Sequence, residues 1–191
     1  MIHIHYVVGV DKSSLLETDN VLTSYYEACA AAGPELCPLY SSTADQIRAR
    51  VDKLVNDVHL RPISVYDGSN PSNPAFGVVD YTVVTQQLMS GLYFPYATGV
   101  QTATEFVQLE NGNGQPIYAG SNEAGINSLD TCQFQQPFVA ELLDISAPIV
   151  CGDTQGRGLK TFEESRAALD ELVETSPFGH IWYNTLVGPC S

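Results

Sequence analysis

Residues 43–58 read TADQIRARVDKLVNDV and carry the clearest structural signal in the chain. Thr43 and Gln46 have the spacing of a capping box, in which a threonine hydroxyl accepts the N–H group three residues later. The apolar residues that follow recur at helical intervals and would share one face: Ile47, Val51, Leu54, Val55 and Val58. The stretch therefore predicts an amphipathic helix, and the segments around it repeat the pattern.

Helical signals continue on both sides of this stretch. Upstream, a helix capped at 14–17 or 18–19 is expected to end at the breaker Gly33-Pro34. Downstream, Asp80 can cap one helix and Pro95 can begin another, which ends at the glycines of 111–114. Three more helices are expected, over 137–143, 161–173 and 177–186.

Strand signals are few and short. Residues 1–10 alternate loosely, and residues 60–76 carry the turn signals of a loop or short hairpin. Residues 115–135 are rich in glycine and asparagine and predict irregular structure, and 148–151 a short extended piece. We therefore predict a mostly α fold: an extended arm over 1–14, followed over 15–191 by an irregular helical domain with long loops.

The net charge of the chain argues against two classes of binding partner. The 191 residues include 22 acidic and 8 basic side chains, which give a formal net charge of −14. Such a surface repels nucleic-acid phosphates and anionic lipid, and no stretch approaches the roughly 20 apolar residues of a membrane span. We predict neither a nucleic-acid nor a membrane partner.

The signals for cellular location conflict. The first ten residues have no basic segment, and no glycosylation sequon is present, which favours an intracellular protein. Five cysteines favour an oxidising compartment instead. Cys29 and Cys37 flank the Gly33-Pro34 turn and are close enough in sequence to form a local bridge, although other pairings and a fully reduced state stay open.

No covalent, metal or nucleotide chemistry is visible in the motifs. The chain lacks a Gly-x-Ser-x-Gly elbow, a phosphate-binding glycine loop and any Cys-x-x-Cys pair. His3 and His5 would share one face of a strand but have no third ligand. We predict no metal and no cofactor.

Aromatic residues are the remaining functional signal. They lie at 25–26, 81, 93–96 and 178–183, and they either fill the core or line a groove for an apolar ligand between helices. His180 stands beside Trp182, either as a packed core histidine or as a proton-transfer group.

Three ordered stretches carry a family resemblance. They are Cys29-Ala-Ala-Ala-Gly-Pro-Glu-Leu-Cys37, then Phe76-Gly-Val-Val-Asp-Tyr-Thr-Val-Val84 with Gly91-Leu-Tyr-Phe-Pro-Tyr96, and finally Ile149-Val-Cys-Gly-Asp153 with Ser176-Pro-Phe-Gly-His-Ile-Trp182 and Cys190. Their order and spacing over about residues 15–190 resemble the helical lid of fungal α/β-hydrolases of the tripeptidyl-aminopeptidase-like kind. In that family the catalytic serine precedes the lid, and the acid and histidine follow it, so no triad residue carries over. The resemblance implies disulfides Cys29–Cys37 and Cys151–Cys190, with Cys132 free.

Two functions follow as hypotheses. In the first, a stand-alone lid binds an apolar small molecule in an aromatic groove and promotes a cyclisation or isomerisation that needs no nucleophile. Its expected catalytic residues are His180, Tyr96 and Asp80, and its expected ligand-binding residues are Tyr81, Tyr93, Tyr96, Phe178 and Trp182. In the second, the chain is a lid fragment of a serine hydrolase and is inactive without its core. A second copy or a separate hydrolase core is the expected protein partner.

Overall fold

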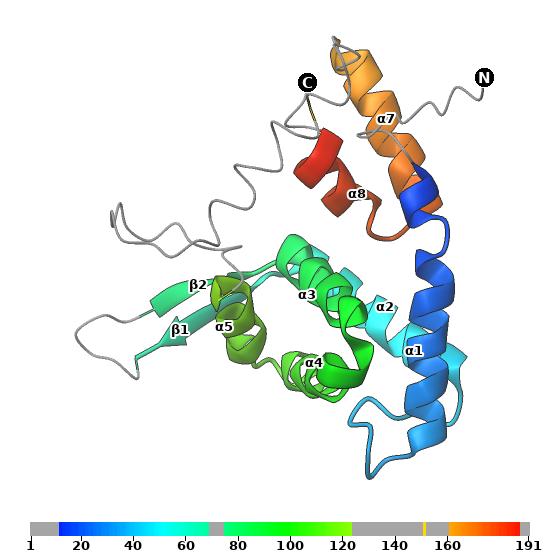
Figure 1. Cartoon of the computed structure of the whole chain (residues 1–191). Helices are drawn as coiled ribbons and strands as arrows, with labels where there is room; N and C mark the ends of the chain where they lie inside the picture. Colours follow the sequence, from blue (N-terminus) through cyan, green and yellow to red (C-terminus); the bar gives the residue numbers. More distant parts are fainter. Residues whose placement is uncertain (1–11, 69–74, 124–150, 152–160, 188–191) are drawn as a thin grey trace. The chain divides into compact units, whose positions relative to one another are not determined.

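The computed structural model describes residues 12–68, 75–123, 151 and 161–187, and these are mostly helical (Figure 1). The mostly α class predicted from the sequence is confirmed, since the regular strands in these ranges form a single two-stranded sheet. The chain divides into two compact units, one of residues 20–131 and one of residues 1–19 with 132–191. Residues 1–11 of the predicted arm and the predicted helix 137–143 lie outside the described residues, as does 148–150 of the predicted extended piece.

The end of α1 and the start of α2 fall at the predicted signals. α1 (Thr18–Ala32) stops before Gly33, whose φ of 79° lies in the left-handed region that favours glycine. α2 (Ala44–Leu60) starts at the predicted cap, where the Thr43 hydroxyl accepts the Gln46 N–H at 3.2 Å. The predicted apolar stripe of α2 supplies core residues: Ile47, Val51, Leu54 and Val58 are buried.

The connection between α1 and α2 is held at several points. Cys29 and Cys37 form the disulfide predicted across the Gly33-Pro34 turn. On α2, the guanidinium of Arg48 donates to the Thr23 hydroxyl at 2.8 Å and lies over the ring of Tyr26 on α1. These contacts hold the side of α2 that carries Arg48 against α1.

The sheet is the hairpin predicted within 60–76, extended by three residues. β1 (Ile63–Asp67) pairs antiparallel with β2 (Ala75–Val79), and Ile63 stands opposite Val79. α5 (Gln115–Glu123) lies against this sheet (Figure 1). The irregular structure predicted from residue 115 is therefore wrong as far as Glu123, because buried Ile117 and Tyr118 hold a helix that local propensity does not favour.

α3 and α4 form a helical hairpin. α3 (Tyr81–Tyr93) is capped by Asp80, whose carboxylate accepts the Val83 N–H at 3.0 Å, as predicted. α4 (Pro95–Glu110) has proline in its first turn, as predicted, and ends before Gly112, where φ is 83°.

The second unit is described over 12–19, 151 and 161–187. It contains η1 (Lys12–Leu15), α7 (Phe162–Thr175), the short α8 (Gly179–Trp182) and the π-helical turn η2 (Tyr183–Val187). α7 follows the helix predicted from residue 161, and a capping box holds its start, with both hydrogen bonds between Thr161 and Glu164 present. Leu15 and Leu172 are buried together, and the partly buried rings of residues 182 and 183 pack on them. No helix within the described ranges combines the length and the apolar character that crossing a bilayer requires.

Candidate functional site

An open groove of about 380 Å³ lies between α2 and α3. Four of its lining residues come from α2 and one from the start of α3: Asp52, Val55, Asn56, His59 and Tyr81. Small-molecule sites have volumes of roughly 300–1,000 Å³, so the groove is large enough for a compact ligand.

The sequence of α2 dictates this lining. Positions 52, 55, 56 and 59 follow the i, i+3, i+4, i+7 pattern, so they form one stripe along the helix. The buried stripe of α2 holds 47, 51, 54 and 58, which lie next to the groove stripe on the helical surface. One face of α2 therefore contributes to the core, and the adjoining face forms one side of the groove.

His59 and Tyr81 bring the two helices together at the groove. Their ring centroids lie 5.1 Å apart with planes at 72°, an edge-to-face arrangement that aromatic rings favour. A tyrosine phenol is protonated at neutral pH, and burial raises the pKa of the half-buried Tyr81 phenol further in the same direction. The groove thus presents a neutral aromatic surface together with an imidazole.

The remaining lining gives the groove mixed chemistry. Val55 adds an aliphatic wall, while Asp52 and Asn56 add a carboxylate and an amide. Such a surface can bury the apolar body of a ligand and hydrogen-bond its polar end. Among the described residues, no three His, Cys, Asp or Glu side chains gather closely enough to hold a metal ion.

Of the predicted site residues in the 20–131 unit, one lines this groove. Tyr81 does so, while Asp80 beside it is occupied as the cap of α3. Tyr93 ends α3 and Tyr96 lies in the first turn of α4. The two ends of α3 are twelve positions apart, about 18 Å at 1.5 Å per residue, so Tyr81 is not brought together with Tyr93 or Tyr96.

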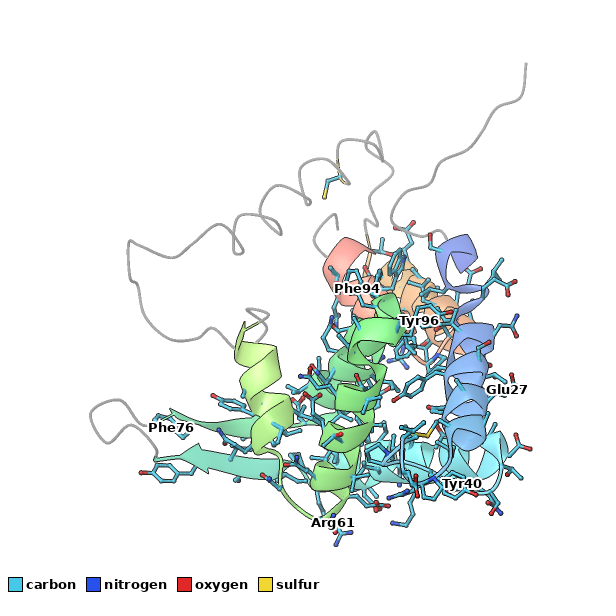
Figure 2. The ribbon with its side chains drawn as sticks, turned by 60° about the horizontal axis from the view of Figure 1, so that its bottom comes forward. Glu27, Tyr40, Arg61, Phe76, Phe94 and Tyr96 are labelled. Carbon is cyan, nitrogen blue, oxygen red and sulfur yellow. A yellow bond between two sulfur atoms is a disulfide. The ribbon has the colours of Figure 1, made fainter. Side chains whose placement is uncertain are left out.

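The residues around Tyr93 form a separate exposed patch, here called the aromatic corner. Tyr93, Phe94, Tyr96 and Val100 are 63%, 68%, 105% and 63% exposed, respectively. Phe94 and Tyr96 are seen at the turn between α3 and α4, well away from Phe76 on the hairpin (Figure 2). Large apolar side chains that are this exposed are a feature of interaction surfaces.

The other predicted residues belong to the second unit. Phe178 is buried, and Trp182 packs against the Leu15–Leu172 core. His180 is half-buried; burial lowers the pKa of its imidazole, against a smaller opposing effect of a hydrogen bond with the Pro177 backbone. The predicted set is therefore divided between two units, and a groove built from both stays a prediction.

Cysteine pairing is confirmed where both partners are described. Cys29 and Cys37 are joined, and Cys151 is also disulfide-bonded. Cys132 and Cys190 lie outside the described residues, so the Cys151–Cys190 pairing stays a prediction.

Sequence reasoning did not select Asp52, Val55, Asn56 and His59 as site residues. The polar members occupy positions that look like the solvated face of an amphipathic helix. The one available signal was the histidine at the end of that stripe, four residues after Val55.

Comparisons with protein-family models, curated proteins and solved structures give no match to this chain. The likeness to hydrolase lids therefore rests on the sequence motifs alone.

Proposed function

We propose that this protein binds an apolar small molecule in the groove between α2 and α3. The observation that carries the proposal is the edge-to-face pair of His59 and Tyr81, set beside Val55 in a groove of about 380 Å³. A flat apolar ligand could pack against both the aromatic pair and the aliphatic wall. The hydrophobic effect favours this packing because it removes apolar surface of the ligand and of the groove from water.

The same proposal describes the protein as a stand-alone relative of hydrolase lids. The helical fold and the Cys29–Cys37 bridge agree with the motifs that resemble a lid. In the enzymes it resembles, the lid roofs the active site, and the catalytic triad lies outside it. A domain of this kind that works alone would keep ligand binding as its function.

We extend the proposal to a cyclisation or isomerisation that needs no covalent intermediate. A groove that holds a ligand in its reactive conformation lowers the barrier by pre-ordering the reacting atoms. His59 and Asp52 add side chains of the types that transfer protons, and the neutral phenol of Tyr81 is a hydrogen-bond donor type.

A groove-filling substitution tests the binding proposal. Asn56 is exposed and lines the groove, so Asn56→Trp would occupy it without touching the core. Glu27→Trp adds the same side chain on the exposed side of α1 (Figure 2), far in sequence from the residues that line the groove, and serves as the control. Native mass spectrometry with a panel of aromatic fragments should show fragments retained by the wild type and by Glu27→Trp and lost from Asn56→Trp. Equal retention by all three proteins, or none by the wild type, would exclude the groove as the site.

The aromatic corner favours a second candidate function, the lid fragment that works only with a hydrolase core. A lid fragment needs an apolar surface where the core docks, and Tyr93, Phe94, Tyr96 and Val100 provide an exposed one. Purification from the natural source would favour this function if a separate hydrolase polypeptide accompanied the chain and Tyr96→Ser with Val100→Ser released it.

A further inference from the structure

We infer that the β1–β2 hairpin binds an extended, positively charged peptide segment of a partner protein as a third strand. The inference is independent of the α2–α3 groove, because it concerns the sheet and not the helices that form the groove. It is carried by two features of the same short sheet: an exposed apolar face and an edge without the usual protection.

The two faces of the hairpin differ in what covers them. Side chains alternate along a strand, so Val65 and Val79 share one face, on which α5 packs, and they are 7% and 0% exposed. Tyr66 stands opposite Phe76 on the other face, and these side chains are 71% and 75% exposed. Val78 on the same face is 49% exposed. Figure 2 shows Phe76 on the hairpin, and its face presents large apolar side chains to solvent.

The edge of β1 can accept another strand. The sheet in the described ranges has two strands, so each strand pairs along one of its edges. Natural proteins usually protect an open edge with proline or with charged side chains, lysine above all. The sequence of β1, ISVYD, contains neither proline nor lysine, and its one charged residue is the last. On β2, the Phe76 carbonyl already accepts the Tyr118 hydroxyl at 2.8 Å, so we place the added strand on β1.

The size of the open face favours a peptide over a second copy of this chain. A buried aromatic side chain contributes roughly 150–250 Å², so Tyr66 and Phe76 give at most about 500 Å². Val78 has a smaller side chain than either. A stable interface between two proteins buries about 800 Å² on each partner, which this face does not reach. A peptide strand needs less apolar area, because hydrogen bonds between main chains supply much of its affinity.

The charge of the protein determines the chemistry of the peptide. A net charge of −14 attracts cations and repels anions. Neither β1 nor β2 contains a lysine or arginine that would repel a basic segment. The expected segment therefore alternates apolar with polar residues, as a strand with one buried face requires, and is flanked by lysine or arginine. Its apolar side chains would lie beside Tyr66 on the open face.

Three synthetic heptapeptides test the inference, each titrated into the full-length protein at pH 7 while amide NMR shifts are followed. The first reads lysine, valine, threonine, valine, threonine, valine, lysine. The second has glutamate at both ends, and the third has proline in place of the central valine. The lysine peptide should shift the amides of residues 63–67 most. The glutamate peptide should bind about tenfold more weakly because the protein repels it. The proline peptide should also bind about tenfold more weakly, because proline has no N–H to donate to β1.

Matched variants locate the binding surface. Tyr66→Thr keeps a β-branched residue in the strand but removes the ring, and it should weaken binding of the lysine peptide about tenfold. Tyr96→Thr removes an exposed ring on α4 and should leave that binding unchanged.

Several results would overturn the inference. They are the absence of lysine-peptide binding to the wild type, equal binding of the lysine and proline peptides, and equal losses in Tyr66→Thr and Tyr96→Thr. The peptide comparison uses the wild type, so it does not depend on the folding of a variant. Light scattering of the protein alone tests the other occupant: a dimer that Tyr66→Thr dissociates would assign the face to a second copy and overturn the peptide inference.

Discussion

The imidazole of His59 on α2 meets the phenol ring of Tyr81 on α3 edge to face, with centroids 5.1 Å apart. His59 is the last residue of the α2 stripe that lines the groove, and Tyr81 is the first residue of α3 after its Asp80 cap. The register of one helix and the start of the other therefore determine this contact. The groove proposed for ligand binding depends on both.

The fit between α5 and the hairpin gives a prediction about two glycines. A Cβ at Gly77 would overlap the ring of Tyr118, whose hydroxyl donates to the Phe76 carbonyl at 2.8 Å. Gly77→Ala should therefore lower the free energy of unfolding by about 1–3 kcal/mol. Gly120→Ala, on α5 itself, is the control: its Cβ would meet only the Gln87 side chain at 3.5 Å, and alanine should raise helix stability by about 0.5–1 kcal/mol. Urea unfolding of both variants checks this, and a similar change in both would contradict the described fit.

The disulfide between α1 and the following loop should stabilise the 20–131 unit. It closes a sequence separation of eight residues, for which chain entropy predicts roughly 2–3 kcal/mol. Replacing both Cys29 and Cys37 by serine should lower the free energy of unfolding by that amount, measured by urea titration followed by circular dichroism. A loss below about 0.5 kcal/mol would show that the bridge adds little to this fold.

Glu105 is a buried acid whose neighbours predict a large substitution effect. Its two carboxylate oxygens accept one N–H each at 2.8 Å, from Gln87 on α3 and Gln101 on α4. Burial, together with the negative charge of Glu105, raises the pKa of Tyr25 nearby to about 12. Glu105→Ala removes the shared acceptor and should cost about 2–4 kcal/mol, whereas Glu27→Ala on exposed α1 should change stability by less than about 0.5 kcal/mol. Thermal unfolding distinguishes the two, and equal effects would contradict the buried network.

The lowered pKa of His180 predicts how stability depends on pH. In the folded state burial disfavours the protonated imidazole, so the unfolded chain binds more protons as pH falls below the ordinary value of 6.5. The contribution of His180 to stability is therefore complete above that pH and declines as pH falls through the folded pKa. Urea unfolding at pH 7.5 and 5.5 should show a smaller decline for His180→Gln than for the wild type. Identical declines would mean that His180 does not titrate differently on folding.

Parts of the fold that depend on local chemistry were predictable from the sequence. The caps at Thr43 and Asp80 are predictable because a side-chain oxygen and the N–H it accepts lie three residues apart. α5 was missed for the opposite reason. Its nine residues include Pro116 and Gly120, and what holds them helical is the packing of Ile117 and Tyr118, which no local pattern records.

The candidate site was predictable only at Tyr81. Aromatic clustering drew attention to Tyr93 and Tyr96, which the structure places at the other end of α3 in an exposed corner. Asp52 and His59 belong to a polar stripe, and polar stripes on helices usually face solvent. Only the position of α3 beside α2 makes that stripe one side of a groove.

Mapping a bound fragment onto the backbone amides tests the central claim most directly. The measurement is an amide NMR titration of the wild-type chain with the tightest-binding fragment from the aromatic panel. Binding in the α2–α3 groove predicts that the largest shift changes fall within residues 52–59 and at the start of α3. Largest changes in the aromatic corner at 93–100, or within 176–182, would contradict the claim and place the ligand at residues selected from the sequence instead.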